Sequence, residues 1–360
     1  MTRVIGIDPG TKSFDFCGLD DGKIFMDAAI PSEDILREPE LVIKLLKSAM
    51  PLDAIVGPSG YGLPLTHITE IDEKKLFLMA LIRPDSKENL GLRKVLNVLK
   101  RENFNIYFIP GVIHMPTVPS YRKVNKIDMG TADKLCCAVL GVFDQSRHYN
   151  IEYDEVSFIL VEMGYGFNAI IGVKKGQIVD GIGGTLDGIG FLSLGAMDGE
   201  IAYLLNKIDK STLRQGGVAY IAGDERITPE EFGERVHSKD YDLAWEAFME
   251  GIEKGVAQMG ISVKEPREIL LSGRLCKVKT IYDELSKRLS ALGKVRRIDG
   301  FAKVAKEAAQ GAALIADGLT GGQNKKLVDF MKIKEAKGTV LDHIYLKAIR
   351  ELKHKYKSKN

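Results

Sequence analysis

A segment near the start of the chain recurs, without gaps, in its second half. Residues 4–26 read VIGIDPGTKSFDFCGLDDGKIFM, and residues 158–180 read FILVEMGYGFNAIIGVKKGQIVD. A shift of 154 positions places Asp8 on Glu162 and aligns three pairs of glycines: Gly10 with Gly164, Gly18 with Gly172, and Gly22 with Gly176. Both copies share the order apolar run, acid, glycine turn, apolar run, tight turn, apolar run. We interpret them as an internal duplication, which requires a fold built from two similar halves.

Each copy predicts a strand, a loop, a second strand, a hairpin and a third strand. The apolar runs have the length and branching of short buried strands. The hairpins fall at 20–23 and 174–177, and the Asp21-Gly22 pair of the first suits a type I′ turn. We expect the two halves to face each other across a cleft, so that both acid-and-glycine loops meet in one place.

The acid-and-glycine loops have the composition of a phosphate and metal site. Glycine permits close approach of the backbone, so the N–H groups of a turn can converge on phosphate oxygens. Asp8 and Glu162 are the expected metal ligands, because hydrated Mg²⁺ takes one or two carboxylates together with waters and phosphates. The residues expected to contact phosphate are Gly10, Thr11, Lys12 and Ser13 in the first copy, and Gly164, Tyr165 and Gly166 in the second.

The duplicated strand-loop-strand with an acid at each exit resembles the acetate and sugar kinase, heat-shock chaperone and actin (ASKHA) superfamily, in which these loops are the phosphate motifs. EILLSGRL at 268–275 is similar to the adenosine motif of that superfamily, and VAKEAAQGAALIADGL at 304–319 resembles its last connecting helix. The resemblance implies a duplicated actin-like ATPase fold of the ribonuclease H-like α/β type, with two domains around a central nucleotide cleft. It also implies ATP and Mg²⁺ as cofactors.

Two positions depart from the superfamily pattern. Glu162 stands where the second loop usually has Asp, and its longer side chain can reach a metal through water. Arg274 stands where the adenosine turn usually has a second glycine, so its side chain either stacks on adenine or blocks it. The resemblance implies that Ser272, Gly273 and Arg274 contact the nucleoside.

A candidate catalytic acid precedes the second copy. DMGTADKLCCAVLGV at 128–142 predicts a helix that is capped by Asp128 or Thr131, with Asp133 in its first turn. An acid at that position can simply complement the helix dipole. The segment also resembles the Gly-Ala-Asp-Arg element of type III pantothenate kinases, with one residue inserted, and this resemblance implies that Asp133 is the catalytic acid-base. Asp128 is the second choice, and Asp8 is a third catalytic candidate through the metal.

A glycine-rich segment follows the third strand of the second copy. Residues 181–200, GIGGTLDGIGFLSLGAMDGE, combine seven glycines and three acids with several apolar residues. A mobile surface loop is one interpretation, but flexible linkers favour Ser and other polar residues. The segment resembles the substrate loop of butyrate and acetate kinases, and this implies that Gly183, Gly184, Asp187 and Gly188 line a small pocket. Arg122, in the proline-rich segment 109–128, is a candidate to hold a carboxylate or a phosphoryl group.

Composition and charge narrow the class of protein. With 45% hydrophobic and 28% charged residues, this 360-residue chain is typical of a globular protein with two domains. We expect an N-terminal domain at 1–150, a C-terminal domain at 151–320 and a basic helical tail at 321–360. Residues 323–360 hold eleven Lys and Arg against four Asp and Glu, so the positive charge lies in the tail and no nucleic-acid partner is expected. A solvated helix and an interaction element are both open for this tail.

The cysteines, histidines and apolar runs give three further expectations. The four cysteines show no CxxC spacing, so we expect reduced and mostly buried thiols. The six histidines show no metal-binding spacing. The sequence begins directly with a strand and no apolar run reaches the roughly 20 residues of a membrane span, so we expect a cytoplasmic protein that binds no membrane. A homodimer remains open.

These features predict an ATP-dependent kinase that transfers the γ-phosphoryl group to a small acceptor. The resemblance to butyrate kinases favours a short-chain carboxylate, which is already ionised and needs no base. An essential Asp133 would instead favour a hydroxylated acceptor such as a polyol. An ATP-dependent switch or assembly protein is the alternative from another functional class.

Overall fold

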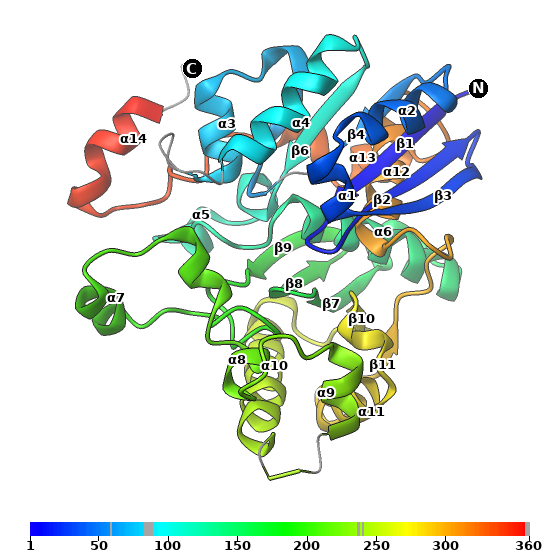
Figure 1. The fold of residues 1–360 in the computed structure, drawn as a ribbon. Coiled ribbons are helices and arrows are strands. Elements are labelled where there is room, and N and C mark those ends of the chain that lie inside the picture. Colours follow the sequence, from blue (N-terminus) through cyan, green and yellow to red (C-terminus); the bar gives the residue numbers. More distant parts are fainter. Residues whose placement is uncertain (58–59, 83–88, 236–237, 240, 357–360) are drawn as a thin grey trace. The chain divides into compact units, whose positions relative to one another are not determined.

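The chain divides into two structural units. The computed structural model describes residues 1–57, 60–82, 89–235, 238–239 and 241–356 (Figure 1). The first unit consists of Met1–Ile127, Thr131–Asp144 and Gly300–Asn360, and the second unit consists of Asp128–Gly130 and Gln145–Asp299. This division differs from the expected domains, because the chain returns to the first unit at Gly300 and carries the C-terminal tail with it.

A mixed sheet forms the centre of the first unit. Its strands lie in the order β3-β2-β1-β4-β6-β5 within the described residues. β1 is antiparallel to β2, which is antiparallel to β3, while β4 and β6 extend the sheet parallel to β1. β5 lies antiparallel to β6 at the edge. The bounds are β1 Arg3–Pro9, β2 Ser13–Asp20, β3 Lys23–Pro31, β4 Ala54–Val56, β5 Gly62–His67 and β6 Ile106–Pro110.

The sheet of the second unit repeats this arrangement. Its strands lie in the order β11-β10-β7-β8-β9 within the described residues. β7, β8 and β9 form the antiparallel part, and β10 and β11 follow parallel to β7. The bounds are β7 Ser157–Met163, β8 Asn168–Lys174, β9 Gln177–Ile182, β10 Glu268–Ser272 and β11 Val295–Arg297.

The duplication predicted from the sequence is confirmed in the backbone of the strands. Both copies form the predicted strand-loop-strand-hairpin-strand. Asp21 and Gly22 have φ of 45° and 75°, and the aligned Lys175 and Gly176 have φ of 51° and 65°, so both hairpins have the positive φ values of a type I′ turn. The register between the second and third strands also shifts at the same aligned position, after Gly18 in one copy and after Gly172 in the other. A shared irregularity of this kind is strong support for a true repeat.

Helices cover the sheet of the first unit. The predicted connecting helix is present as α12, which packs on β1, β2 and β4 (Figure 1, orange against blue). A Cβ atom on Gly6 of β1 would lie 2.2 Å from the backbone nitrogen of Ala313, so only glycine allows this close approach. The helices of this unit are α1 Ser32–Arg37, α2 Glu40–Ser48, α3 Glu73–Ala80, α4 Asn89–Arg101, α5 Ser120–Lys123, most of α6 Ala132–Tyr149, α12 Glu307–Leu319, α13 Lys325–Phe330 and α14 Arg350–Tyr356.

The basic tail packs into the first unit in part: buried residues occur up to Ile344, and none of the described residues after it is buried. Leu327, Val328, Met331 and Ile333 are fully buried. The segment is divided into short helices rather than one, because Lys332 has a left-handed φ of 58° after α13. The interpretation of this segment as a solvated terminal helix is therefore wrong for residues 327–333. Its charge lies on a segment that also supplies core residues.

The second unit packs its helices around one apolar cluster. Trp245, Phe248 and Met259 of α10 pack with Phe191 from the glycine-rich segment. Phe191 is fully buried, so the mobile-loop interpretation of 181–200 does not hold there. The helices are α7 Gly199–Leu205, α8 Val218–Ile221, α9 Pro229–Arg235, α10 Asp242–Val263 and α11 Lys279–Leu289.

The cysteine prediction is confirmed. The thiols of Cys17, Cys136, Cys137 and Cys276 are buried and form no disulfide. In the part of the chain that the structure describes, no helix has both the length and the apolar character that crossing a membrane requires.

Candidate functional site

The two acid-and-glycine loops close in the same way. In the loop between β1 and β2, the Gly10 N–H donates to the Ser13 carbonyl at 3.0 Å. In the loop between β7 and β8, the aligned Gly164 N–H donates to the Phe167 carbonyl at 3.1 Å. Both glycine amides are therefore used within their own loops. Thr11 and Lys12 form the exposed tip of the first loop. In the second loop Gly166 is itself buried, although a Cβ atom on it would meet nothing within 4 Å.

Two buried acids lie side by side at the base of the first loop. Asp8 ends the apolar run of β1, and Asp15 is its direct partner across the β1–β2 ladder. Asp8 is 7% exposed and Asp15 is 1% exposed. Directly paired residues of two strands point to the same face of the sheet, so like charges at these positions repel each other. Asp15 is not among the predicted site residues, although an acid inside the apolar run SFDFCGL is a visible signal.

Lys306 compensates this acidic pair. Its Nζ lies 2.8 Å from Asp15 Oδ2 and donates to Ser13 Oγ at 2.8 Å. The Ser13 hydroxyl in turn donates to Asp15 Oδ2 at 2.7 Å. Lys306 directly precedes α12, and no local sequence pattern indicates that it reaches the first loop.

Asp133 lies in the first turn of α6, as predicted. Lys134 pairs with its carboxylate at 3.1 Å, and the Thr131 hydroxyl donates to the same carboxylate. Burial opposes ionisation of Asp133, but Lys134 and Thr131 outweigh it and hold the pKa below its usual range. Asp133 is therefore ionised at neutral pH, and its charge acts on Asp8.

The surroundings make Asp8 hard to ionise. Burial is the main cause that raises its pKa from 3.8 to about 7, and the negative charge of Asp133 adds to it. Lys306 opposes the rise, and Asp15 reinforces it. The site in the first unit thus gathers an excess of negative charge at the end of β1.

In the second unit, Glu162 occupies the position equivalent to Asp8. It ends the apolar run of β7, is 6% exposed, and is paired in parallel register with Ser272 of β10. Gly273 follows with φ of 89°, and a Cβ atom on it would lie 2.3 Å from the Met163 carbonyl oxygen. The predicted strand and glycine turn of the 268–275 motif are confirmed. Within the described residues, the buried Ser272 Oγ has no hydrogen-bond partner.

Arg274 lies over the second loop. Its guanidinium carbon is 5.7 Å from the centre of the Tyr165 ring, and its Nη2 is 3.7 Å from a Glu230 carboxylate oxygen. The side chain is 39% exposed, so it remains accessible to a ligand. The candidates Tyr165 and Arg274 therefore form one surface in the second unit.

Asp128 belongs to the glycine-rich segment rather than to α6. Its carboxylate accepts from the Gly130 N–H at 3.1 Å and from the N–H and hydroxyl of Thr185 at 3.2 Å each. Thr131, and not Asp128, directly precedes α6. A Cβ atom on Gly183 would lie 1.8 Å from Asp128 Oδ1, so the segment lies directly against this acid.

The remaining substrate candidates divide between the units. Asp187, in the second unit, is 7% exposed, and burial raises its pKa to about 7, with the Asp128 charge adding to the effect. Gly184 lies against Phe167, and Gly188 lies against Gly251 of α10. Arg122 belongs to the first unit, where its guanidinium lies 5.6 Å from the Tyr121 ring centre.

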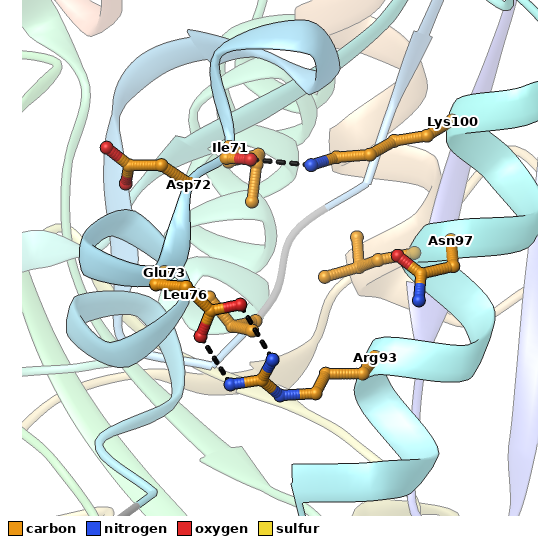
Figure 2. A pocket seen from close by; sticks show the side chains of 8 residues that line it. Ile71, Asp72, Glu73, Leu76, Arg93, Asn97 and Lys100 are labelled. Carbon is orange, nitrogen blue, oxygen red and sulfur yellow. Dashed lines mark hydrogen bonds and ion pairs between the residues drawn. The ribbon is translucent and has the colours of Figure 1, made fainter. Parts of the chain in front are cut away.

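A separate pocket of about 380 Å³ lies between α3 and α4 in the first unit. Figure 2 shows Glu73 facing Arg93 and the Lys100 ammonium directed at the Ile71 carbonyl. Arg93 donates to Glu73 at 2.6 Å and Lys100 donates to the Ile71 carbonyl at 2.5 Å, so these charged side chains have partners within the pocket lining. Its described lining includes none of the candidates named above. The lining residues are Ile71, Asp72, Glu73, Leu76, Arg93, Leu96, Asn97 and Lys100.

Comparison with solved structures identifies the fold. Acetate kinase from Porphyromonas gingivalis aligns with a TM-score of 0.62 at 12% identity, over 87% of this chain and 98% of that protein. A propionate kinase from Francisella tularensis gives 0.62 at 14% identity, over 87% and 98%. Acetate kinase from Entamoeba histolytica gives 0.59 at 14% identity, over 81% and 87%. The likeness shows that this chain shares the two-domain α/β fold of these kinases, which agrees with the predicted duplicated actin-like fold.

Comparison with curated protein sequences gave no match. A family-level match, in contrast, covers nearly the whole chain. The chain belongs to the family described as Protein of unknown function (DUF1464), which matches residues 6–346.

Proposed function

We propose that this protein is an ATP-dependent kinase that transfers the γ-phosphoryl group of Mg-ATP to a small acceptor. The observation that carries the proposal is the repeated loop: each unit has an acid at the end of its first strand, followed by a glycine whose N–H closes the turn in the same way. A fold shared with acetate and propionate kinases supports it.

Both loops would contact the phosphates of the nucleotide. The exposed tip of the first loop would face the phosphates, and Tyr165 and Gly166 would do so from the second. Ser272, Gly273 and Arg274 would contact the nucleoside. Ser272 supports this assignment, because its buried hydroxyl has no hydrogen-bond partner in the described part of the chain and a polar ligand group would satisfy it.

Asp8 and Glu162 suit Mg²⁺. No group of three or more His, Cys, Asp or Glu side chains is arranged to hold a metal within the described ranges. Mg²⁺ does not require such a group, because it takes one or two carboxylates and completes its shell with waters and phosphates. Asp8, whose ionisation is opposed by burial and by Asp133, lies where a divalent cation would be favourable. When bound, Mg²⁺ would neutralise charge on the transferred phosphoryl group.

A short-chain carboxylate is the proposed acceptor. One of its oxygens would bond to the γ-phosphorus while the bond to the bridging oxygen breaks and ADP leaves with the electron pair. This acceptor needs no base, which agrees with an Asp133 whose pKa is held low and which is a correspondingly weak base. The apolar, glycine-rich segment of the second unit would supply the pocket.

A hydroxylated small molecule is the second candidate acceptor. The observation in its favour is that the charge of Asp133 raises the pKa of Asp8. A carboxylate that would accept the proton of a hydroxyl group therefore lies near the expected metal ligand. A non-metabolic ATP-dependent switch is the alternative from another class.

One screen separates these alternatives. The protein is incubated with Mg-ATP and, separately, with acetate, propionate, butyrate and a set of polyols, and ADP release is followed with a no-acceptor control. Acyl phosphates are trapped with hydroxylamine, which phosphate esters survive. Carboxylate-dependent ADP release with a trapped product is the expected result. Polyol-dependent release would support the second candidate, and acceptor-independent turnover would support the switch.

A further inference from the structure

Lys306 lies at the first loop although it is distant from it in the sequence. Its ammonium contacts Ser13 Oγ and Asp15 Oδ2, each at 2.8 Å, and its backbone N–H donates to Asp15 Oδ1 at 3.3 Å. Asp15 is therefore held by both the backbone and the side chain of Lys306. These contacts fix the ammonium at one position beside the loop.

That position borders the space where phosphate would be held. A Cβ atom on Gly10 would lie 2.9 Å from the Ser13 carbonyl oxygen, 3.0 Å from Lys306 Nζ and 3.7 Å from Asp8 Oδ2. A side chain at position 10 would therefore crowd the Lys306 ammonium, and glycine avoids this. The Lys306 side chain is 26% exposed, whereas that of Asp15 is 2% exposed, so of this pair the lysine is the one that a ligand can reach.

The donors of Lys306 are not exhausted by its partners. An ammonium carries three N–H donors. In the described part of the chain, Ser13 and Asp15 account for two of them. A third donor can therefore bind an oxygen at the loop without breaking either contact.

We propose that Lys306 binds the phosphoryl oxygens of the nucleotide at the first loop, and that Asp15 and Ser13 are positioning residues that hold its ammonium there. This inference rests on the proposed kinase function and names a residue that the repeat itself does not contain. Lys306 stabilises the negative charge on the non-bridging oxygens during transfer. It forms no covalent bond and moves no proton.

A purely structural role for Lys306 makes a different prediction. If Lys306 only neutralises the buried Asp15, then removing both charges together should restore both the stability and the tripolyphosphate affinity that are lost when one charge is removed. The test compares Lys306→Gln, Asp15→Asn and the double variant with Lys303→Gln, a matched control on an exposed lysine of the same segment. For each protein, urea unfolding reports stability and calorimetric titration reports the affinity for inorganic tripolyphosphate.

We expect Lys306→Gln to lose both stability and affinity, and the double variant to recover stability only. Its affinity for tripolyphosphate should stay about 10- to 100-fold below that of the wild type, which is the usual effect of removing a charge-assisted hydrogen bond. Lys303→Gln should bind as the wild type does. Recovery of wild-type affinity in the double variant would overturn the inference and leave the kinase proposal intact.

A second measurement uses the wild-type chain alone, so it does not depend on the folding of any variant. Lysine acetylation by an amine-reactive reagent is followed by mass spectrometry with and without saturating tripolyphosphate. Lys306 should be protected by at least about 10-fold and Lys303 should not. Equal labelling of Lys306 in both samples would overturn the inference. Protection of Lys306 in a protein that phosphorylates no acceptor would sustain it and overturn the kinase proposal, whereas absence of tripolyphosphate binding would overturn both.

Discussion

Replacing Asp8 with Asn should stabilise the folded protein increasingly as the pH rises. The pKa of Asp8 is raised from 3.8 to about 7, chiefly by burial. Between these values the folded protein keeps a proton that the unfolded chain has already released. The free energy of unfolding of the wild type therefore falls as the pH rises through this window, and the loss is complete above about pH 7. Asn makes no such contribution.

The expected size follows from the shift. A pKa difference of about 3 corresponds to about 4 kcal/mol, at about 1.4 kcal/mol for each unit of pH. This is an upper limit, because the effective dielectric constant at buried sites in proteins is nearer 20 than 4. We expect the variant to gain about 2 to 4 kcal/mol over the wild type between pH 5 and pH 8.

Urea unfolding of both proteins at pH 5 and pH 8 measures this gain. The wild-type curve is subtracted from the Asp8→Asn curve at each pH, so that most other titrating groups cancel. Asp154→Asn, at an exposed acid of the second unit, serves as the control for replacing an acid outside the site. A difference for Asp8→Asn that stays constant, or that favours the wild type at pH 8, would refute the reasoning.

Two further predictions concern backbone contacts and catalysis. Gly6→Ala should destabilise the first unit by more than about 2 kcal/mol, because its Cβ atom would lie 2.2 Å from the backbone of α12. Gly260→Ala, within α10, should stabilise the protein by up to about 1 kcal/mol, because a Cβ atom there meets nothing within 4 Å. Urea unfolding measures both changes. Asp133→Asn should leave folding and ATP affinity intact. If the acceptor is a hydroxylated molecule, the turnover of this variant should fall by about 100- to 10,000-fold; if it is a carboxylate, turnover should remain near that of the wild type. Steady-state kinetics with the accepted substrate measures this turnover.

The local structure of the repeat could be predicted because its signals are short-range. Apolar runs between turn residues indicated the strands of both copies, and the Asp21-Gly22 pair indicated the type I′ turn. The start of α6 and the glycine turn after β10 were also readable, since caps and turns depend on neighbouring residues. Asp133 was placed correctly in the first turn for the same reason.

The contacts that hold the site together could not be predicted, because they join distant parts of the chain. Lys306 and Asp15 are 291 residues apart, and no local pattern marks their ion pair. The unit boundaries were missed for a related reason: α12 and the tail return to the first unit through tertiary packing of residues such as Leu327 and Ile333. A solvated tail was predicted from its positive charge, whereas the burial of its apolar residues determines where the segment packs.

Titration of Mg-ATP into the wild type, Gly10→Val and Gly164→Val tests the central claim most directly. If the two loops serve one nucleotide, the wild type should show a single binding site per chain, and it should gain about 2.7 kcal/mol of stability at about 100 times the dissociation constant. Each valine variant should lose binding, because a branched side chain blocks approach of the phosphates to the backbone. Absence of Mg-ATP binding by the wild type, or unchanged binding in both folded variants, would contradict the account.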